Sequence, residues 1–226
     1  MSPIQINGLV LHTLRERDLY TRPTKRDIHG NLWDVISDAP MATEFSISRF
    51  FVPHLVKLKT RREVQRPGSR WALFMDCDML VTQPIERLFA LADDRYAVMV
   101  VKHNHVPTEA TKMDGQHQTQ YGRKNWSSVM LFNIDHPSNV GLSLELLNGV
   151  PGRDLHQFCW LPDDAIGELP LTWNYLVGHN RPQELGDAEM RPPCNIHYTE
   201  GIPTMHGYEN CDFAGLWHDE LRLWSA

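Results

Sequence analysis

The sequence lacks the features of a membrane or secreted protein. No run approaches the roughly 20 apolar residues that a membrane-spanning helix needs. The N-terminus, MSPIQINGLVLHTLRER, has no basic start followed by a long apolar stretch, so it does not read as a signal peptide. There is also no internal repeat and no low-complexity segment. We therefore expect no membrane span.

Cysteine is scarce, and its spacing excludes a common class of metal site. The four cysteines are Cys77, Cys159, Cys194 and Cys211, and no two of them form a CxxC pair. This spacing argues against a structural zinc site. Cys77 lies between two aspartates after an apolar run, which is a poor place for a disulfide. We expect four reduced thiols and, from them, a cytoplasmic protein.

Basic residues are outnumbered, which bears on the partners of the chain. There are 28 acidic and 22 basic residues, with a formal net charge of -6. This balance argues against a nucleic-acid partner, which usually needs a basic face. The length of 226 residues and a hydrophobic fraction of 42% suit a single domain over residues 1–226 with a sizeable core. The composition does not indicate the oligomeric state.

Apolar patterning predicts alternating strands and helices and hence an α/β fold with a mixed, mostly parallel sheet flanked by helices. Residues 19–40 and 103–125 read as loops, and residues beyond Pro151 show little regular pattern. Pro40 stands where a helix can begin, and Pro53 would kink or split that helix. The expected strands are residues 4–14, 71–80, 96–101 and 127–134, and the expected helices are residues 42–58, 85–92 and 142–147.

The triplet Asp76-Cys77-Asp78 is the central chemical signal. It ends a short continuous apolar run, which is typical of a buried strand whose carboxyl end emerges at a site. Residues two apart in a strand point to the same side, so both carboxylates would face one ligand if the strand continues to Asp78. Hard carboxylate oxygens suit Mg²⁺ or Mn²⁺, which also take oxygens from a diphosphate. The alternative is a solvated acidic turn after a core strand.

Small polar residues precede the last expected strand. Asn and Ser side chains can hydrogen-bond sugar hydroxyls, Trp126 can stack on a sugar face, and Arg123 and Lys124 could meet phosphate. The alternative is a strand-entry turn with a solvated basic pair. The residues of this segment that could bind a donor are Lys124, Asn125, Trp126, Ser127 and Ser128.

Two further groups complete the candidate site. Asp163 and Asp164 stand near an apolar Trp segment and could position an acceptor hydroxyl or steady a positive sugar centre. Asp after Pro also caps helices well, so a helix N-terminus is an equal reading. His197 with Gly201 nearby fits a metal ligand beside backbone that approaches phosphate closely, although a lone histidine is more often structural.

Several stretches together resemble the nucleotide-sugar transferases of the GT-A fold, in particular the glycogenin- and galactosyltransferase-like group. The resemblance covers residues 4–226 and is closer still to a set of uncharacterised bacterial transferases. Each motif is loose, but their order and spacing are specific. The motifs are TEFSISRF at residues 43–50, FMDCDML at 74–80, KMDGQ at 112–116, RKNWSSVMLFN at 123–133, IGELP at 166–170 and HYTEGIP at 197–203.

The resemblance implies a function and a role for each candidate residue. The protein would move a sugar from a nucleoside-diphosphate donor to an acceptor hydroxyl. Asp76, Asp78 and His197 would hold Mn²⁺ or Mg²⁺, and Arg49 resembles the basic residue that reaches the nucleotide or its phosphates. Asn125, Ser127 and Ser128 resemble the strand mouth that lines the donor sugar. Asp163 or Asp164 resembles the acid near the reacting carbon, and Gly201 the glycine that lets backbone meet the diphosphate.

The sequence departs from this family in two places. A phosphate-contacting lysine is expected after the His-Gly element, but residues 202–206 are IPTMH, and the His-to-Gly spacing is one residue longer than usual. The segment SPIQINGLVL resembles the family's second strand, so the fold would lack the first strand-helix unit. Two alternatives stay open. One is a non-catalytic nucleotide-sugar-binding domain, and the other is a D-x-D phosphohydrolase whose first Asp is a nucleophile.

Overall fold

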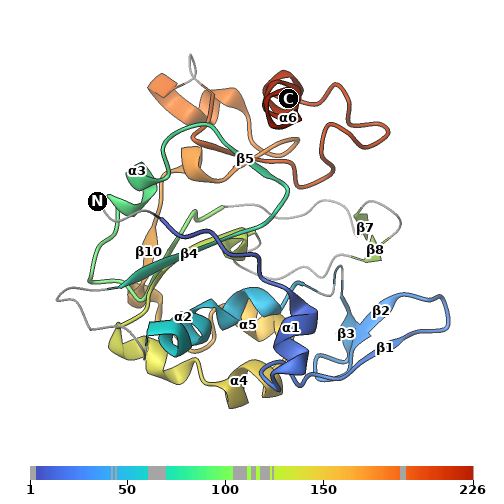
Figure 1. Cartoon of the computed structure of the whole chain (residues 1–226), viewed down its shortest axis with the longest axis vertical. Coiled ribbons are helices and arrows are strands. Elements are labelled where there is room, and N and C mark those ends of the chain that lie inside the picture. The colour runs from blue at the N-terminus through green and yellow to red at the C-terminus, as the bar shows by residue number, and fades with distance from the viewer. Residues whose placement is uncertain are drawn as a thin grey trace.

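A four-stranded sheet forms the centre of the protein. The computed structural model describes residues 4–41, 43, 45–60, 70–103, 111–112, 116–117, 123, 125–188 and 192–225. Figure 1 shows the central sheet with helices on one side and the C-terminal part of the chain on the other. The strand order is β10 (Ile166–Glu168), β6 (Val98–Val100), β9 (Val129–Asn133) and β4 (Trp71–Met75).

The two middle strands are buried on both faces because their side chains alternate between two cores. Val98 and Val100 of β6 belong to the core under the helices, whereas Met99 belongs to the opposite core. The same alternation separates Phe132 from Leu131 in β9. A strand covered on both faces gives a continuous apolar run instead of an alternating one. This explains why YAVMVV and VMLFN could be recognised in the sequence.

Helices cover one face of this sheet. They contribute fully buried side chains such as Phe50, Leu147 and Leu155 to the core. Their apolar contacts to β6 and β9 hold the sheet in place from below in Figure 1. The helices are α1 (Leu11–Glu16), η1 (Ser48–Phe51), α2 (Val52–Thr60), α4 (Leu144–Gly149) and α5 (Gly152–His156).

A second sheet lies on the other side and carries part of the site. Its strand order is β11 (Tyr175–Leu176), β12 (Asn195–His197) and β5 (Met79–Val81). Together with α6 (Ala214–Trp224) and the segment before it, this sheet buries its own apolar cluster. The remaining elements are α3 (Glu86–Phe89), β7 (Thr111–Lys112), β8 (Gln116–His117), η3 (Trp126–Ser128), η4 (Pro137–Gly141), η5 (Asp163–Ala165), η6 (Leu171–Trp173) and η7 (Pro182–Ala188).

Several expected elements are wrong in the first quarter of the chain. Residues 4–14 are not a strand, because α1 begins at Leu11 after an extended segment. The comparison of this segment with a second strand is therefore also wrong. Residues 19–40 are not a loop but hold the antiparallel strands β1 (Thr24–Arg26), β2 (Leu32–Asp34) and β3 (Ala39–Pro40). Polar composition hid this small sheet, because most of its side chains are exposed or half-buried.

Other expectations need smaller corrections. Pro40 ends a strand instead of opening a helix. Pro53 lies in the first turn of α2, directly after η1, so the expected helix is split into a 3₁₀ part and an α part beside this proline. The sheet is mixed as expected but not mostly parallel. Among the described strands, only β10–β6 and β11–β12 are parallel pairs. The region beyond Pro151 holds three strands and the long helix α6. The strands are too short, and the helix is too polar, to show in the apolar pattern of the sequence.

Two findings bear on the cysteines and on membrane spans in the described part of the chain. The four cysteines are all free thiols. None of the helices described is both long enough and apolar enough to cross a lipid bilayer.

A buried ion pair joins the small sheet to the helical layer. Arg22 and Asp34 have no exposed surface, and the Nε of Arg22 donates to Asp34 Oδ1 at 3.2 Å. The same guanidinium donates to the carbonyls of Leu147 at 3.0 Å and Val150 at 2.7 Å, at the end of α4. Every charged group in this pair is therefore hydrogen-bonded, as burial requires.

Removing one partner of this pair should destabilise the fold. Arg22→Met leaves the Asp34 carboxylate buried without a counter-charge, so we expect the free energy of unfolding to fall by about 3–5 kcal/mol. Urea denaturation followed by circular dichroism measures this loss. The control is Arg26→Met in the exposed part of β1, which should cost under about 0.5 kcal/mol. Equal losses in both variants would contradict the role given to Arg22.

Candidate functional site

The Asp76–Asp78 segment is the junction between the two sheets. Strand β4 ends at Met75, and β5 begins at Met79, so the expected strand through residue 80 is interrupted at the triplet. The Asp76 N–H donates to the Ser128 carbonyl at 3.1 Å, and the Asp78 carbonyl accepts from the Tyr198 N–H at 3.0 Å. One aspartate is thus tied to the central sheet and the other to the second sheet.

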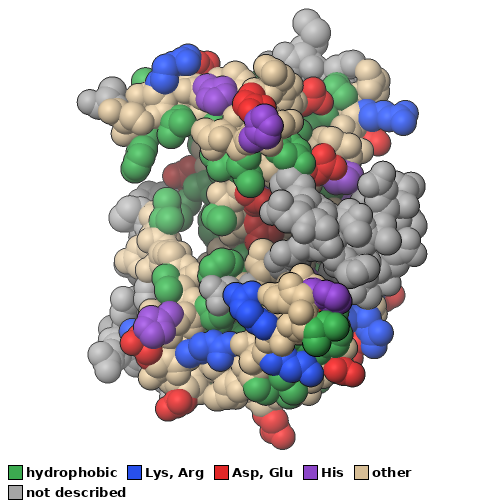
Figure 2. Space-filling model, turned by 90° about the vertical axis from the view of Figure 1, so that its right-hand side faces the viewer, with side chains coloured by type: hydrophobic (Ala, Val, Ile, Leu, Met, Phe, Trp, Pro, Cys, Tyr) green, Lys and Arg blue, Asp and Glu red, His purple; other side chains and the backbone are tan. Residues whose placement is uncertain are grey.

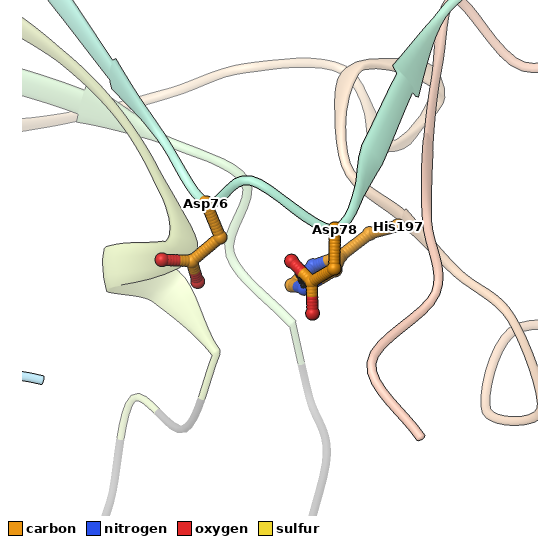
Figure 3. Close-up of side chains that lie close together, drawn as sticks. All are labelled: Asp76, Asp78 and His197. Atoms are coloured by element: carbon orange, nitrogen blue, oxygen red, sulfur yellow. Dashed lines mark ion pairs between the residues drawn. The ribbon is translucent and has the colours of Figure 1, made fainter. Parts of the chain in front are cut away.

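His197 reaches this junction through strand register. It is the last residue of β12 and lies opposite Met79 of β5, directly after Asp78. Ligand atoms of Asp76, Asp78 and His197 all lie within 4.8 Å of one another. The Nε2 of His197 is 3.3 Å from Asp78 Oδ1. Figure 3 shows both carboxylates on one side of the bend, with the imidazole beside Asp78. The structure thus brings together the three residues expected to bind metal.

Arg49 balances the charge of Asp76. Its guanidinium makes two contacts with the Asp76 carboxylate, at 3.1 and 3.0 Å, and donates to the Ser127 carbonyl at 2.9 Å. Burial raises the pKa of Asp76, whereas the charges of Arg49 and His197 lower it. Arg49 was expected at the nucleotide or its phosphates. In this structure it lies at the metal-ligand group.

The segment before β9 forms the edge of the site next to Asp76. Asn125 has a left-handed backbone with φ of 63°, and the turn η3 that follows places Ser127 and Ser128 in the interior. The Trp126 indole donates to the His103 carbonyl at 3.0 Å, and Lys102 Nζ lies 5.8 Å from its ring centroid. Lys124 lies outside the described residues.

Asp163 and Asp164 lie in the exposed turn η5. The Asp163 side chain is 88% exposed and pairs with Arg123, whose guanidinium also lies over the Trp126 ring at 5.5 Å. Its ion-pair partner is therefore Arg123 and not a member of the Asp76–Asp78–His197 group. These acids open only a short 3₁₀ turn, and its N-cap residue is Pro162.

Gly201 lies four residues beyond His197, beside a tyrosine. A Cβ at this position would come within 2.6 Å of the Tyr208 ring, so glycine is required for the close packing. A cavity of about 220 Å³ adjoins this contact and is lined in part by Val177, Tyr198 and Asp212. The contact that the glycine permits here is with an aromatic ring.

Two side chains at the site received no role from the sequence. Asn174 is fully buried, and its Oδ1 lies 3.0 Å from His197 Nδ1. His156 Nδ1 lies 2.7 Å from the Ser127 hydroxyl. Asn174 follows a turn after Pro170 and His156 ends a helix, so neither belongs to a motif with a fixed spacing to Asp76 or His197. Tertiary packing brings them to the site, Asn174 from the turn before β11 and His156 from the end of α5.

The surface is hollowed between the two sides of the molecule. Figure 2 shows this hollow at mid-height, with acidic side chains inside it and basic side chains on the surface below. Such a hollow beside convergent polar groups is the usual setting of a ligand site.

Comparison with known proteins gives one clear relative. The chain is 42% identical over 220 residues to Protein CDI of Arabidopsis thaliana, covering 97% of this chain and 75% of that protein. This relative is a plant protein, and the expected bacterial subgroup stays a prediction. No family model matches the chain.

Solved structures give the fold. The bifunctional glycosyltransferase WbbM, in its apo form, superposes with a TM-score of 0.53 at 16% identity, covering 82% of this chain and 36% of that one. The chain thus spans about a third of WbbM, and at this identity the likeness shows the fold, which is of the GT-A type as expected. The apo glycosyltransferase GlyE of Streptococcus pneumoniae TIGR4 gives 0.45 at 16% identity, covering 79% and 43%.

Loss of the Arg49 guanidinium should destabilise the chain when no divalent cation is present. Arg49→Met leaves a partly buried carboxylate at Asp76 without its counter-charge. We expect a loss of roughly 1–3 kcal/mol in the free energy of unfolding, less than for a fully buried pair. Urea denaturation in a chelating buffer measures it.

Arg95→Met is the matched control, because its pair with Asp93 is on the surface. Exposed pairs contribute little, so this variant should lose under about 1 kcal/mol. If the two arginine variants unfold at the same urea concentration, Arg49 does not neutralise Asp76 in the way described.

Proposed function

The chain belongs to the family of Protein CDI, and from its site geometry and its fold we propose that it is a glycosyltransferase. It would move a sugar from a nucleoside-diphosphate donor to a hydroxyl group of an acceptor. The observation that carries the proposal is the meeting of Asp76, Asp78 and His197 at the junction of two sheets, in a fold shared with WbbM.

The donor set fits a divalent ion. Two carboxylates supply hard oxygen ligands and His197 supplies one nitrogen, a combination that suits Mn²⁺ or Mg²⁺. Asp76, Asp78 and His197 would hold the ion, which when bound would stabilise the negative charge on the departing nucleoside diphosphate. With one imidazole and no thiolate, the group differs from the cysteine-rich sets of structural zinc sites.

The chain's own cations would assist at the same place. Arg49 lies against Asp76, and its guanidinium can turn from a carboxylate to a phosphate because it recognises both with the same pair of N–H groups. Lys102 and Arg123 lie on the Trp126 ring at the edge of the site. They could attract the diphosphate, in place of the lysine missing from residues 202–206.

The remaining assignments are proposals of the same kind. Asn125, Trp126 and Ser127 would line the donor sugar from the segment before β9, with Lys124 beside them in the sequence. Asp163 or Asp164 would face the reacting carbon or the acceptor hydroxyl. For Asp163 this requires release from Arg123, because the carboxylate cannot serve both groups at once.

Asp78→Asn tests the proposed reaction. The substitution keeps the side-chain shape but removes one anionic ligand. With a panel of nucleoside-diphosphate sugars and Mn²⁺ or Mg²⁺, we expect release of nucleoside diphosphate to fall at least about 100-fold. Chelation by EDTA should stop release by the unmodified protein, and added Mn²⁺ should restore it.

Asp219→Asn is the control, since it makes the same chemical change on the exposed face of α6. An unchanged rate in Asp78→Asn would count against the metal site. Donor binding without release in the unmodified protein would favour a non-catalytic sugar-nucleotide-binding domain. Hydrolysis of a generic aryl phosphate that requires Asp76 would favour the phosphohydrolase alternative.

The two acids of η5 can be separated by amide substitution. A carboxylate that acts at the reacting centre typically contributes about 10²–10⁴ to the rate. We expect Asp163→Asn or Asp164→Asn to lower kcat by such a factor while donor binding, measured by calorimetry, changes little. Arg123→Met frees Asp163 without removing it. If Asp163 is only a partner for Arg123, Asp163→Asn will leave kcat unchanged.

A further inference from the structure

The amide of Asn174 connects the segment before β9 to the ring of His197. Asn174 is fully buried, and its Nδ2 lies 2.9 Å from the Ser128 hydroxyl, while its Oδ1 lies 3.0 Å from His197 Nδ1. The Ser128 hydroxyl in turn donates to the Asn125 carbonyl at 2.7 Å. Four residues from three parts of the chain thus form one line of hydrogen bonds.

The Asn125 carbonyl at one end of this line fixes the direction of each hydrogen bond in it. A backbone carbonyl only accepts, so the single hydroxyl hydrogen of Ser128 is used on Asn125. The oxygen of Ser128 then presents a lone pair to Asn174, which must meet it with its NH₂ group. The same NH₂ group also lies 3.4 Å from the Asn125 carbonyl, a second group that only accepts. The amide cannot be flipped without setting acceptor against acceptor.

The fixed amide decides the state of the imidazole. With its NH₂ group facing Ser128, Asn174 presents its oxygen to His197 Nδ1, which must therefore carry a hydrogen. In the neutral ring the lone pair is then on Nε2, the atom 3.3 Å from Asp78 Oδ1. We infer that Asn174 and Ser128 are positioning residues that hold His197 in the Nδ1–H tautomer.

Ser128 is thus a positioning residue and not one of the residues that bind the donor. Its hydroxyl is buried and used on both sides, by Asn125 and by Asn174, so it serves His197 instead of a sugar hydroxyl. The role of this hydrogen-bond line in metal binding by His197 rests on the proposed function. A lone pair on Nε2 facing a carboxylate oxygen at 3.3 Å is repulsive until a cation lies beside both. The hydrogen-bond line thus prepares His197 to act as a metal ligand.

Histidine ring nitrogens report the tautomer directly. In the metal-free protein at mildly alkaline pH, ¹⁵N-correlated NMR should show His197 with a protonated Nδ1 and an unprotonated Nε2. His197→Gln assigns the signal among the twelve histidines. A protonated Nε2 in the neutral ring would overturn the inference, whatever the protein does with metal.

Two substitutions at one position separate tautomer control from packing. Asn174→Leu removes the acceptor, and we expect the tautomer mixture to move toward Nε2–H and Mn²⁺ affinity, measured by calorimetry, to fall about 10–100-fold. Asn174→Asp keeps an acceptor for Nδ1–H, so His197 should keep its tautomer and the protein should bind Mn²⁺ at least as tightly. An unchanged tautomer and affinity in Asn174→Leu would contradict the role of Asn174.

Ser128→Ala and Asn139→Leu are two further test variants. Ser128→Ala removes the nearer of the two groups that orient the amide, so the His197 signals should shift part of the way in the direction seen for Asn174→Leu. Asn139 is equally buried but bonds to the Ala97 and Asn133 carbonyls, so its loss should lower stability without moving those signals. If the unmodified protein shows the Nδ1–H tautomer yet binds no Mn²⁺ or Mg²⁺, the proposed metal site fails while the tautomer assignment stands.

Discussion

Two main-chain hydrogen bonds at the junction of the sheets determine where the site lies. One joins Asp76 to Ser128, and the other joins Tyr198 to Asp78. Backbone bonds of this kind do not depend on the side chains they position, so the bend can carry two carboxylates without relying on them for its shape. The two sheets are thus fixed to each other at the point where the chain changes from β4 to β5, and every ligand atom of the site is placed relative to that point.

Charge in this protein is buried only where it is surrounded by partners. Arg22 is held by Asp34 and by two carbonyls at the end of a helix, and Arg49 is held by Asp76 and by the Ser127 carbonyl. The first pair is fully enclosed and joins two layers of the fold. The second keeps part of its surface exposed, so a ligand could compete for either partner.

Short-range pattern was enough to find the strands next to Asp76 and Ser128, but not β12, which carries His197, and not the arrangement of the strands. The run after Ser128 is recognisable because both faces of β9 are covered. The run before Asp76 is β4, a half-buried edge strand whose apolar side chains pack against both cores, and a turn with two acids follows it. The small sheet of residues 24–40 has no such signal, because strands with mostly half-buried or exposed side chains resemble a polar loop. The helix expected over residues 42–58 begins only at Ser48, and it changes from η1 to α2 beside Pro53.

Some residues of the candidate site could be found from the sequence and others could not. Asp76 and Asp78 are neighbours in the sequence, and resemblance to a family added Arg49 and His197. Asn174 could not be found, because its importance comes from three hydrogen bonds to residues 23 to 49 positions away in the chain. The GT-A fold itself was predicted from the order of the motifs and is supported by the superposition on WbbM.

The pairing of β12 limits where relatives of this chain can gain or lose residues. His197 is held from both sides, by β11 in parallel and by β5 in antiparallel register. A slip of one residue would send the imidazole to the opposite face of the sheet. The connection between β11 and β12 carries no such constraint, because its length does not change which residues pair. Relatives can therefore lengthen or shorten that connection freely, whereas an insertion within the three residues of β12 would remove the histidine from the site.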